Sequence, residues 1–458
     1  MKGIKKSKKD LTPNKDIWKT AEEITSRVVP PTFPNRVFSI IDFGAKPDAP
    51  DNTAAFSRAI SACHEAGGGR VLVPSGRFHS GPIHLKSNVN LHLEHGATVE
   101  FIPNEELYLP IVRAAYEGNE LMGYSPLLYA FKEENIALSG QGTFNGHGDA
   151  PIWTEGCIGR MHQRHDGLRL AKMGEENLPI EQRRFGTDCG LRPNMLQFLY
   201  CKNILIEGLT FIQSPMWMLN PFACRNITIR NVTINNSVSN GDGIDPESCS
   251  DVLIQDCVLN TRDDCIAIKS GRDAEGRRRN MPTENVVVER CLLNIAPNPQ
   301  DSRNGFAIGS EIAGGARNIF VRDCVIRSRI RGIIIKSNTD RGGIVENIHF
   351  RDIEIDDQVG RGCKSAIIMI MRYGDRPLDG PYPPTFRNFS FERIHAKQIE
   401  NALALEGSPK SFIRDLRLSD CSFETSDPDL IILCAEAPVL ERVSINGVQI
   451  NQVQQADL

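Results

Sequence analysis

The sequence has no run of apolar residues long enough to cross a membrane, since no stretch approaches the roughly 18 residues that a span requires. It has no basic excess either, because a net charge of −4 gives no electrostatic footprint for nucleic acid. The basic N-terminus is not followed by the apolar stretch of a secretory signal. These absences predict a cytoplasmic protein that binds neither membrane nor nucleic acid. A periplasmic or secreted protein is the alternative if a signal peptide once preceded the chain.

The sequence has 13 cysteines but no sign of a disulfide framework. Their number is odd, and no pair has the CxxC spacing of metal or redox sites. Several fall where buried strands are expected, which predicts reduced core thiols. The histidines show no metal-ligand spacing, so neither a metal nor a cofactor is expected. Apolar residues make up 40% of the chain, enough for a sizeable core.

The chain does contain a repeated nine-residue unit, with Asn or a substitute first and apolar residues at positions 2, 4, 7 and 9. Two short strands joined by a tight corner explain this pattern, because the apolar side chains of each strand then face inward. Asn suits the corner, since it tolerates the left-handed conformation. The copies begin at Asn203, Asn226, Asp251, Asn285, Asn318, Asn347, Asn388, Asp415 and Arg442, after a looser copy at Asn135.

Successive copies begin between 23 and 41 residues apart, without helical patterning. Such a period is typical of a solenoid in which each repeat makes one coil. Each coil carries a further apolar strand, such as CIAIKSG, GFAIGSE and GIIIKSN, and these strands would form one continuous parallel sheet. The sequence therefore predicts an all-β fold, a single-domain right-handed parallel β-helix over residues 37–458.

Helical spacing occurs before the repeats, at 52–69, where Phe56 and Ile60 precede a run of glycines. This segment is expected to form a cap helix over the open N-terminal end of the solenoid core. Residues 1–36 are expected to be an N-terminal extension. The segment 145–195 lacks clear periodicity and is expected to form loops at the rim.

Aligning the apolar strands of successive coils brings charged residues side by side. Neighbouring parallel strands lie about 4.8 Å apart, so three carboxylates and two lysines are expected to converge. Asp263 and Asp264 are adjacent in the middle of this cluster. The residues that fall level on four successive coils are Asp242, Asp264, Asn304 and Arg331, and five positions further along Lys269 is level with Lys336.

Three interpretations of this cluster compete. Single Asp residues commonly mark turns, but three stacked carboxylates repel one another and are costly unless they serve a function. A calcium site is the main chemical rival, since carboxylate oxygens are hard ligands. Glycoside hydrolysis needs one protonated and one ionised carboxyl group, and crowding supplies that difference. The last interpretation is favoured.

At these residues the chain resembles glycoside hydrolase family 28, the polygalacturonases and rhamnogalacturonan hydrolases. The family's Asn-Thr-Asp motif appears as NGDGID at 240–245, and its Asp-Asp motif as RDDC at 262–265. The stretch IIDFGAKPDAPDNTAAFSRAISAC is similar to the family's opening signature. YSPLLYA and IGSEIAGGARN resemble its bacterial and plant exo-acting branch. The resemblance covers residues 37–450.

The resemblance implies a role for each aspartate. Asp263 would be the general acid that protonates the leaving oxygen, and Asp242 and Asp264 would activate water, with inversion at the anomeric carbon. The stacking argument alone points the other way, because carboxyl groups about 5 Å apart favour retention. Inversion therefore rests on the resemblance.

Two positions depart from the family pattern. The family's His position is occupied by Arg303 or Asn304, and the Arg of its Arg-Ile-Lys motif by Ile334, while Lys336 is kept. In polygalacturonases that Arg/Lys pair holds the galacturonate carboxylate just beyond the cleavage point, and an apolar side chain cannot make this contact. We therefore expect a leaving sugar other than galacturonate, as in rhamnogalacturonan. The alternatives are that Arg303 or Arg331 restores the lost charge, or that activity is impaired.

Other polar residues near the cluster are candidates for sugar contacts. Lys269 is suited to bind a terminal carboxylate or to neutralise the aspartates, and Tyr373 resembles a family tyrosine near the substrate ring. Trp217 is either a sugar platform or a packing residue. The predicted substrate-binding residues are Asn240, Lys269, Asn304, Glu311, Arg331, Lys336 and Tyr373.

Together these features predict an inverting, exo-acting glycosidase that releases galacturonic acid from pectic chains, with rhamnogalacturonan-type linkages preferred. An exopolygalacturonase acting on homogalacturonan is the first alternative, and a non-catalytic carbohydrate-binding solenoid is the second. A β-elimination lyase is disfavoured, because no calcium-type acidic run accompanies the three aspartates. A capped solenoid works as a monomer, so the pectic substrate is the one partner expected.

Overall fold

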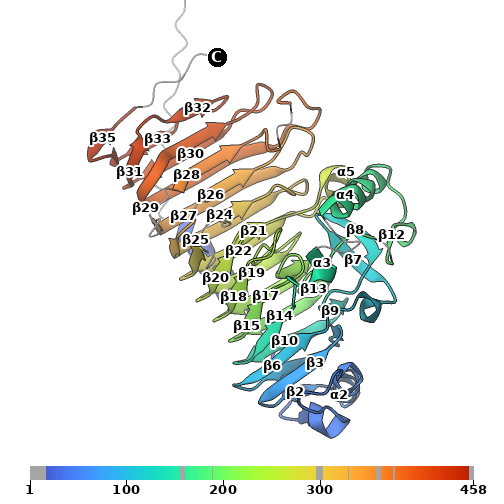
Figure 1. The fold of residues 1–458 in the computed structure, drawn as a ribbon. Helices are drawn as coiled ribbons and strands as arrows, with labels where there is room; N and C mark the ends of the chain where they lie inside the picture. Colours follow the sequence, from blue (N-terminus) through green and yellow to red (C-terminus); the bar gives the residue numbers. More distant parts are fainter. Residues whose placement is uncertain are drawn as a thin grey trace, which may run out of the picture.

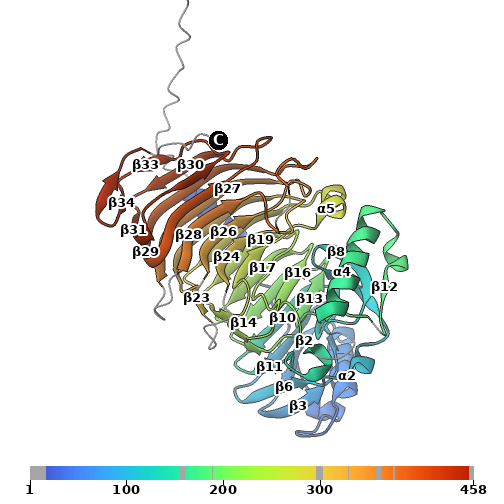
Figure 2. The same ribbon diagram turned by 45° about the horizontal axis from the view of Figure 1, so that its top comes forward.

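The chain winds into a right-handed parallel β-helix whose coils stack along one long axis (Figures 1 and 2). The computed structural model describes residues 17–154, 160–187, 189–295, 303–328, 330–356, 363–374 and 377–452. Each coil contributes short strands to three parallel sheets, here called the first, second and third face. The all-β solenoid expected from the repeat is confirmed.

The first face holds the strands that open each nine-residue unit, paired in parallel from coil to coil. Its strands are β1 (Val37–Ser39), β2 (Gly69–Val73), β5 (Val89–Leu93), β10 (Glu134–Gly140), β14 (Lys202–Glu207), β17 (Arg225–Arg230), β19 (Ser250–Gln255), β22 (Thr283–Glu289), β25 (Ala316–Ile326), β27 (Ile344–Asp356), β29 (Thr385–Glu406), β30 (Arg414–Ser419) and β33 (Val439–Glu441).

The second face takes the strands that close each unit, and the later parts of β25, β27 and β29 continue into it. Its other strands are β3 (Gly76–Ser80), β6 (Ala97–Phe101), β11 (Thr143–Asn145), β15 (Thr210–Ile212), β18 (Thr233–Asn236), β20 (Val258–Thr261), β23 (Leu292–Ile295), β31 (Ser422–Asp427), β34 (Val443–Ile445) and the antiparallel β35 (Val448–Ile450).

The third face is built from the additional apolar strand of each coil, and the expected continuous parallel sheet is present. Ile244 joins it through single bridges to Leu219 and Ile266. Its strands are β4 (Ile83–His84), β9 (Leu128–Phe131), β13 (Leu196–Leu199), β16 (Leu219–Phe222), β21 (Ile266–Ile268), β24 (Asn304–Ile308), β26 (Arg331–Lys336), β28 (Cys363–Ile370), the last part of β29 and β32 (Ile431–Leu433).

The leading Asn of each unit adopts the left-handed conformation and forms a ladder of side-chain amides along the axis. Asn203 donates to Asn135 at 2.8 Å, and Asn226 donates to Asn203 at 2.9 Å. Asp251 has no amide hydrogen to donate, and here Arg27 of the N-terminal helix α1 (Ile17–Arg27) donates to its carboxylate at 2.9 Å. The unit's first position is thus a corner that also links neighbouring coils.

The interior is filled by stacked aliphatic and phenyl side chains, because the inward positions of neighbouring coils lie level. The rings of Phe144 and Phe211, for example, stack with centroids 5.4 Å apart. The expected cap helix is α2 (Thr53–Glu65), which closes the N-terminal end (Figure 1). None of the 12 cysteines in the described residues forms a disulfide.

The segment 145–195 is not simply loops, which corrects the expectation. It contains α3 (Pro151–Thr154), α4 (Arg160–Glu175) and the short strand β12 (Arg184–Phe185). Helix α4 lies against strand β8 (Asn119–Gly123) beside the solenoid (Figure 2). Few of its side chains are buried, so its sequence carries no clear apolar periodicity.

Helix α1 lies across the outside of the first face, where Trp18 packs edge-on against Phe320 with ring centroids 5.7 Å apart. Residues 1–16 of the expected N-terminal extension lie outside the described residues. The remaining helices are η1 (Ile40–Phe43), η2 (Glu105–Tyr108), η3 (Ile180–Gln182) and α5 (Asp273–Arg279). No helix in the described parts of the chain is long and apolar enough to span a membrane.

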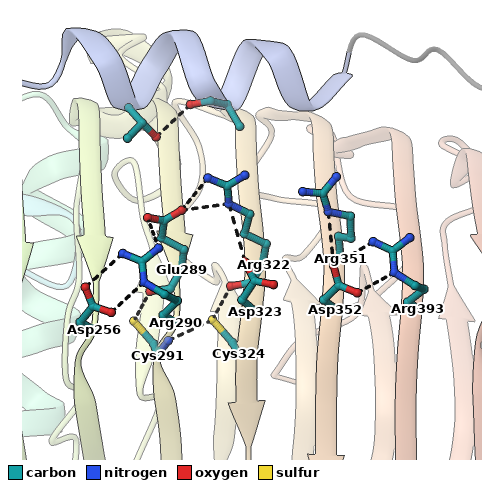
Figure 3. A network of polar contacts seen from close by, with 12 residues as sticks. Asp256, Glu289, Arg290, Cys291, Arg322, Asp323, Cys324, Arg351, Asp352 and Arg393 are labelled. Carbon is teal, nitrogen blue, oxygen red and sulfur yellow. Dashed lines mark hydrogen bonds and ion pairs between the residues drawn. The ribbon is translucent and has the colours of Figure 1, made fainter.

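Arginines and acids alternate along the corner between the first and second faces (Figure 3). Arg290 lies 2.8 Å from Asp256 of the preceding coil and also contacts Glu289, which Arg322 of the next coil approaches at 2.7 Å. These side chains, with further members two coils along, tie neighbouring coils together on the side away from the third face.

Candidate active site

The predicted register on the third face is confirmed. Ile244 is level with Ile266, Ile266 with Phe306, and Asn304 with Arg331. Asp242, Asp264, Asn304 and Arg331 therefore occupy one level on four successive coils, as the alignment of apolar strands predicts.

A pocket of about 320 Å³ opens over this level of the third face. All three aspartates and both lysines of the predicted cluster line it. Of the other predicted residues, Asn240, Glu311, Tyr373 and Trp217 also line the pocket, whereas Asn304 and Arg331 do not.

Asp264 is the ionised member of the aspartate group. The Nζ atom of Lys336 lies 2.6 Å from Oδ2 of Asp264, and the Asn304 amide donates to Oδ1 at 2.5 Å. Burial would raise the pKa of Asp264, but the lysines Lys336 and Lys269 and these hydrogen bonds outweigh it and lower the pKa. A carboxylate held in this form is suited to accept a proton.

Asp263 has the opposite character. Burial and the adjacent charge of Asp264 raise its pKa above the usual range, against the smaller opposing effects of Lys336, Arg303 and Lys269. Neighbouring carboxyl groups with pKa values shifted in opposite directions are the arrangement that divides acid and base roles. Asp263 is thus suited to donate a proton.

Asp242 is paired with Lys269, whose Nζ lies 3.4 Å from Oδ2 of Asp242 and 3.3 Å from Oε2 of Glu311. Burial raises the pKa of Asp242, and Lys269 opposes the rise. Lys269 also lies 4.3 Å from the centroid of the Trp217 ring. Its ammonium is therefore held between two acids and an indole, which fixes its position at the pocket wall.

Glu311 is held by cations on both sides. Burial would raise its pKa, but Lys269, Arg341 and Arg272 outweigh it, so the carboxylate stays ionised. Arg341 approaches Glu311 at 3.4 Å and Asp273 at 3.1 Å. Acidic and basic side chains therefore alternate from Lys269 through Glu311 and Arg341 to Asp273.

The two departures from the family pattern have definite environments. The side-chain amide of Asn304 donates a hydrogen bond to Asp264. The guanidinium of Arg331 lies 3.4 Å from the side-chain oxygen of Asn304 and does not pair with Asp264. Ile334 is buried beside Ala267 and Ala307 in an apolar strip. No cation therefore stands at the Ile334 position.

Arg303 does reach the pocket. Its Nη1 atom lies 3.7 Å from Oδ2 of Asp263, and its side chain is 52% exposed, whereas that of Asp263 is 14% exposed. Of the two arginines considered for replacing the lost charge, it is Arg303 that lines the pocket.

Sequence reasoning missed Glu117, which closes one side of the pocket. Glu117 and Gly118 form the two-residue turn of a hairpin between β7 (Val112–Tyr116) and β8, and both have positive φ. A short loop ending in Gly between two strand-like runs was the available signal. What the pattern does not give is the place where the hairpin docks.

The Glu117 turn docks on residues that border the aspartates. Its carboxylate accepts a hydrogen bond from Asn240 at 3.1 Å and one from Arg272 at 3.0 Å. A side chain at Gly118 (φ 89°) would lie 2.6 Å from the Arg272 backbone nitrogen, so close approach requires glycine. The turn therefore forms a wall of the pocket beside the coils that carry Asp242 and Asp264.

A buried ionic network holds the hairpin rigidly. Glu120 of β8 receives Arg113 at 2.8 Å and the Tyr200 hydroxyl at 2.8 Å. Arg279 of α5 lies 3.0 Å from Glu275, which also pairs with Arg183. Tyr200 joins the hairpin to the solenoid, and Arg279 joins it to α5 because its guanidinium also lies 3.4 Å from Glu120. Among the described residues, no group of three or more His, Cys, Asp or Glu side chains is placed to hold a metal ion.

The comparisons with known proteins agree with this fold. A solved structure of a hyperthermoactive exopolygalacturonase from Thermotoga maritima matches with a TM-score of 0.87 and 37% identity, covering 94% of this chain and 96% of that one. "Probable polygalacturonase" of Vitis vinifera is 30% identical over 81% of this chain and 71% of its own length. The exo-poly-α-D-galacturonosidase of Dickeya chrysanthemi is 24% identical over 76% of this chain and 59% of its own.

The relatives, together with the carboxylate pocket on the solenoid, identify a glycoside hydrolase. The model of the glycosyl hydrolases family 28 matches residues 63–439. The chain belongs to this family, so the expectation of an enzyme is confirmed and a non-catalytic solenoid is set aside.

Proposed function

We propose that the protein removes single galacturonic acid residues from the non-reducing ends of α-linked galacturonan chains. The observation that carries the exo action is the docked Glu117 turn, which ends the pocket just beyond the aspartates. A pocket of about 320 Å³ takes few sugar rings, and Glu117 lines it on the side where a longer chain would have to continue.

The basic residues of the pocket support an acidic substrate. Arg272 contacts the Glu117 turn, Lys269 lies on the Asp264 coil, and Arg303, Lys336 and Arg341 come from later coils. Charge-assisted hydrogen bonds from such groups are the usual way to hold a sugar carboxylate.

In the reaction, Asp263 donates its proton to the glycosidic oxygen as the bond to the anomeric carbon breaks. Asp264, ionised beside Lys336, takes a proton from the attacking water, and Asp242 orients that water. The hydroxyl of the water becomes the new anomeric hydroxyl, with inversion.

The expected preference for rhamnogalacturonan is replaced here by the alternative. The two relatives are named probable polygalacturonase and exo-poly-α-D-galacturonosidase, and the solved structure with 37% identity is an exopolygalacturonase. Arg303 also supplies a cation in the pocket where Ile334 supplies none.

Product analysis tests this proposal. Oligogalacturonates and rhamnogalacturonan oligosaccharides are digested in parallel and followed by chromatography and mass spectrometry, with the Asp263→Asn variant as the inactive control. We expect early release of galacturonate alone from the oligogalacturonates. Early products of intermediate length would contradict exo action, and release from the rhamnogalacturonan set alone would contradict the substrate.

A further inference from the structure

Arg303 lies beside Asp263 at the edge of the pocket, where its guanidinium can also reach a bound substrate. In the free enzyme its guanidinium is 3.7 Å from Asp263, which is longer than a hydrogen bond, and about half of the side chain is exposed. Its backbone is fixed, because the Arg303 carbonyl accepts from the nitrogens of Ile330 and Arg331 at 3.1 Å each. The backbone of Arg303 is therefore held by hydrogen bonds, while its guanidinium is only weakly held.

The place beside Arg303 is where a leaving sugar has to lie. The Glu117 turn closes the pocket on the side of the earlier coils, so the rest of the substrate extends toward the later coils. On that side Lys336 is already committed to Asp264 at 2.6 Å, and Ile334 offers no charge. Among the described pocket residues on that side, Arg303 is the cation without a close hydrogen-bonded acid.

We propose that Arg303 moves from Asp263 to the carboxylate of the leaving sugar when substrate binds, and that this transfer leaves Asp263 protonated for catalysis. The inference rests on the proposed function, because it requires a uronate on the leaving side. Arg303 is then both a specificity-determining residue and a positioning residue for the proton.

The sign of the effect follows from the groups that face Asp263. Asp264 and burial raise the pKa of Asp263, while Lys336, Arg303 and Lys269 lower it. Lys336 and Lys269 stay on their buried partners, Asp264 on one side and Asp242 and Glu311 on the other. Neutralising Arg303 with a bound carboxylate removes one lowering influence, so the pKa of Asp263 rises further and its carboxyl group keeps its proton to higher pH until it gives that proton to the glycosidic oxygen.

The test compares two disaccharides, digalacturonate and the same compound methyl-esterified on the leaving sugar. In a pH–rate profile, the alkaline limb is the fall in rate at high pH, and it reports the pKa of the essential acid. The limb of kcat/KM reports that pKa in the free enzyme, and the limb of kcat reports it in the enzyme–substrate complex. For wild type on the diacid, we expect the kcat limb to lie at higher pH than the kcat/KM limb. On the ester the two limbs should coincide, and kcat/KM should fall by about tenfold or more, as loss of a charge-assisted contact implies.

With digalacturonate as substrate, the alkaline limbs of kcat and kcat/KM should coincide in the Arg303→Gln variant. The limb of kcat/KM should lie at higher pH than in wild type. The variant should also reduce the preference for diacid over ester to near unity. Arg303→Lys keeps a charge and should keep a separation between the limbs, although it loses the planar fork. Arg414→Gln removes an exposed arginine far from the pocket and is the matched control.

Two results would overturn the inference: limbs that already coincide in wild type on the diacid, or an unchanged diacid preference in Arg303→Gln. These results differ from failure of the proposed function, in which wild type would release no galacturonate from the diacid at all.

Discussion

The ammonium of Lys336 lies 2.6 Å from a carboxylate oxygen of Asp264, and both side chains are buried in the floor of the pocket. For Asp263, the residue before it, the ion-pair partner found within the described parts of the chain is the more distant Arg303, at 3.7 Å. Two adjacent carboxyl groups therefore sit in different electrostatic surroundings. This difference is what allows one of them to hold a proton while the other accepts one.

Replacing Lys336 by Met should disable Asp264 as the base. Without the cation the pKa of Asp264 rises, so the acid limb of the kcat profile moves to higher pH, and kcat falls by about 10²-fold or more. The measurement is the pH dependence of galacturonate release. Lys336→Arg retains the charge and should keep the limb near its wild-type position; an unshifted limb in Lys336→Met would rule out this role.

Opening the wall should change the products. Replacing Glu117 and Gly118 by a longer flexible Gly-Ser loop removes the contacts to Asn240 and Arg272, so a second sugar can pass the aspartates. We expect digalacturonate among the early products from oligogalacturonates. The single substitution Arg278→Gln, on α5 but outside the pocket lining, is the control. Continued release of the monosaccharide alone would show that another feature sets the exo action.

Stability should depend on pH through Glu247. This carboxyl group is fully buried, and burial raises its pKa to about 7, against the opposing charges of Arg279 and Lys269. The folded protein therefore holds a proton that the unfolded chain releases above its ordinary pKa of 4.5. Unfolding free energy should fall as pH rises from about 4.5 to 7 because of this group.

Glu247→Gln should flatten that part of the stability curve. Melting temperatures of wild type and variant, measured every half unit of pH, check the prediction. The melting temperature of the variant should rise relative to that of wild type as pH increases from about 4.5 to 7. Parallel curves would show that Glu247 does not titrate in this range.

The alternating arginines and acids of Figure 3 should contribute modestly to stability, and their contribution should depend on salt. Arg290 contacts Asp256 and Glu289 but its side chain is 47% exposed, so Arg290→Gln should cost about 0.5–1 kcal/mol. Because exposed charges are screened, the difference should shrink in 1 M NaCl, where the screening length is about 3 Å. Denaturant melts at low and high salt give the comparison, and a salt-independent loss would indicate packing rather than charge.

The architecture was predictable because each coil repeats the same physical problem. Asn203 and its counterparts need a left-handed corner, and the apolar positions that follow need a shared interior, so the pattern is written in every repeat. The level of Asp242, Asp264 and Asn304 follows from the same register, which is why the acidic cluster could be placed from the sequence.

The rest of the site depends on contacts that no repeat encodes. Glu117 meets Arg272 across 155 residues of sequence, through a hairpin outside the solenoid pattern. Helix α4 was missed because it buries few side chains. The loss of an arginine at Ile334 suggested an uncharged leaving sugar, whereas the compensating cation, Arg303, could be assigned to the pocket only from its side-chain position.

Proton NMR of the first turnovers on trigalacturonate resolves the anomer and the size of each new product, and so tests the roles of the aspartates and the exo action together. We predict that free galacturonate forms first as the β anomer, the inverted product of an α linkage, together with digalacturonate left from the rest of the chain. First appearance of the α anomer would contradict the assigned roles of Asp263 and Asp264. It would instead favour retention, as closely spaced carboxyl groups alone suggest.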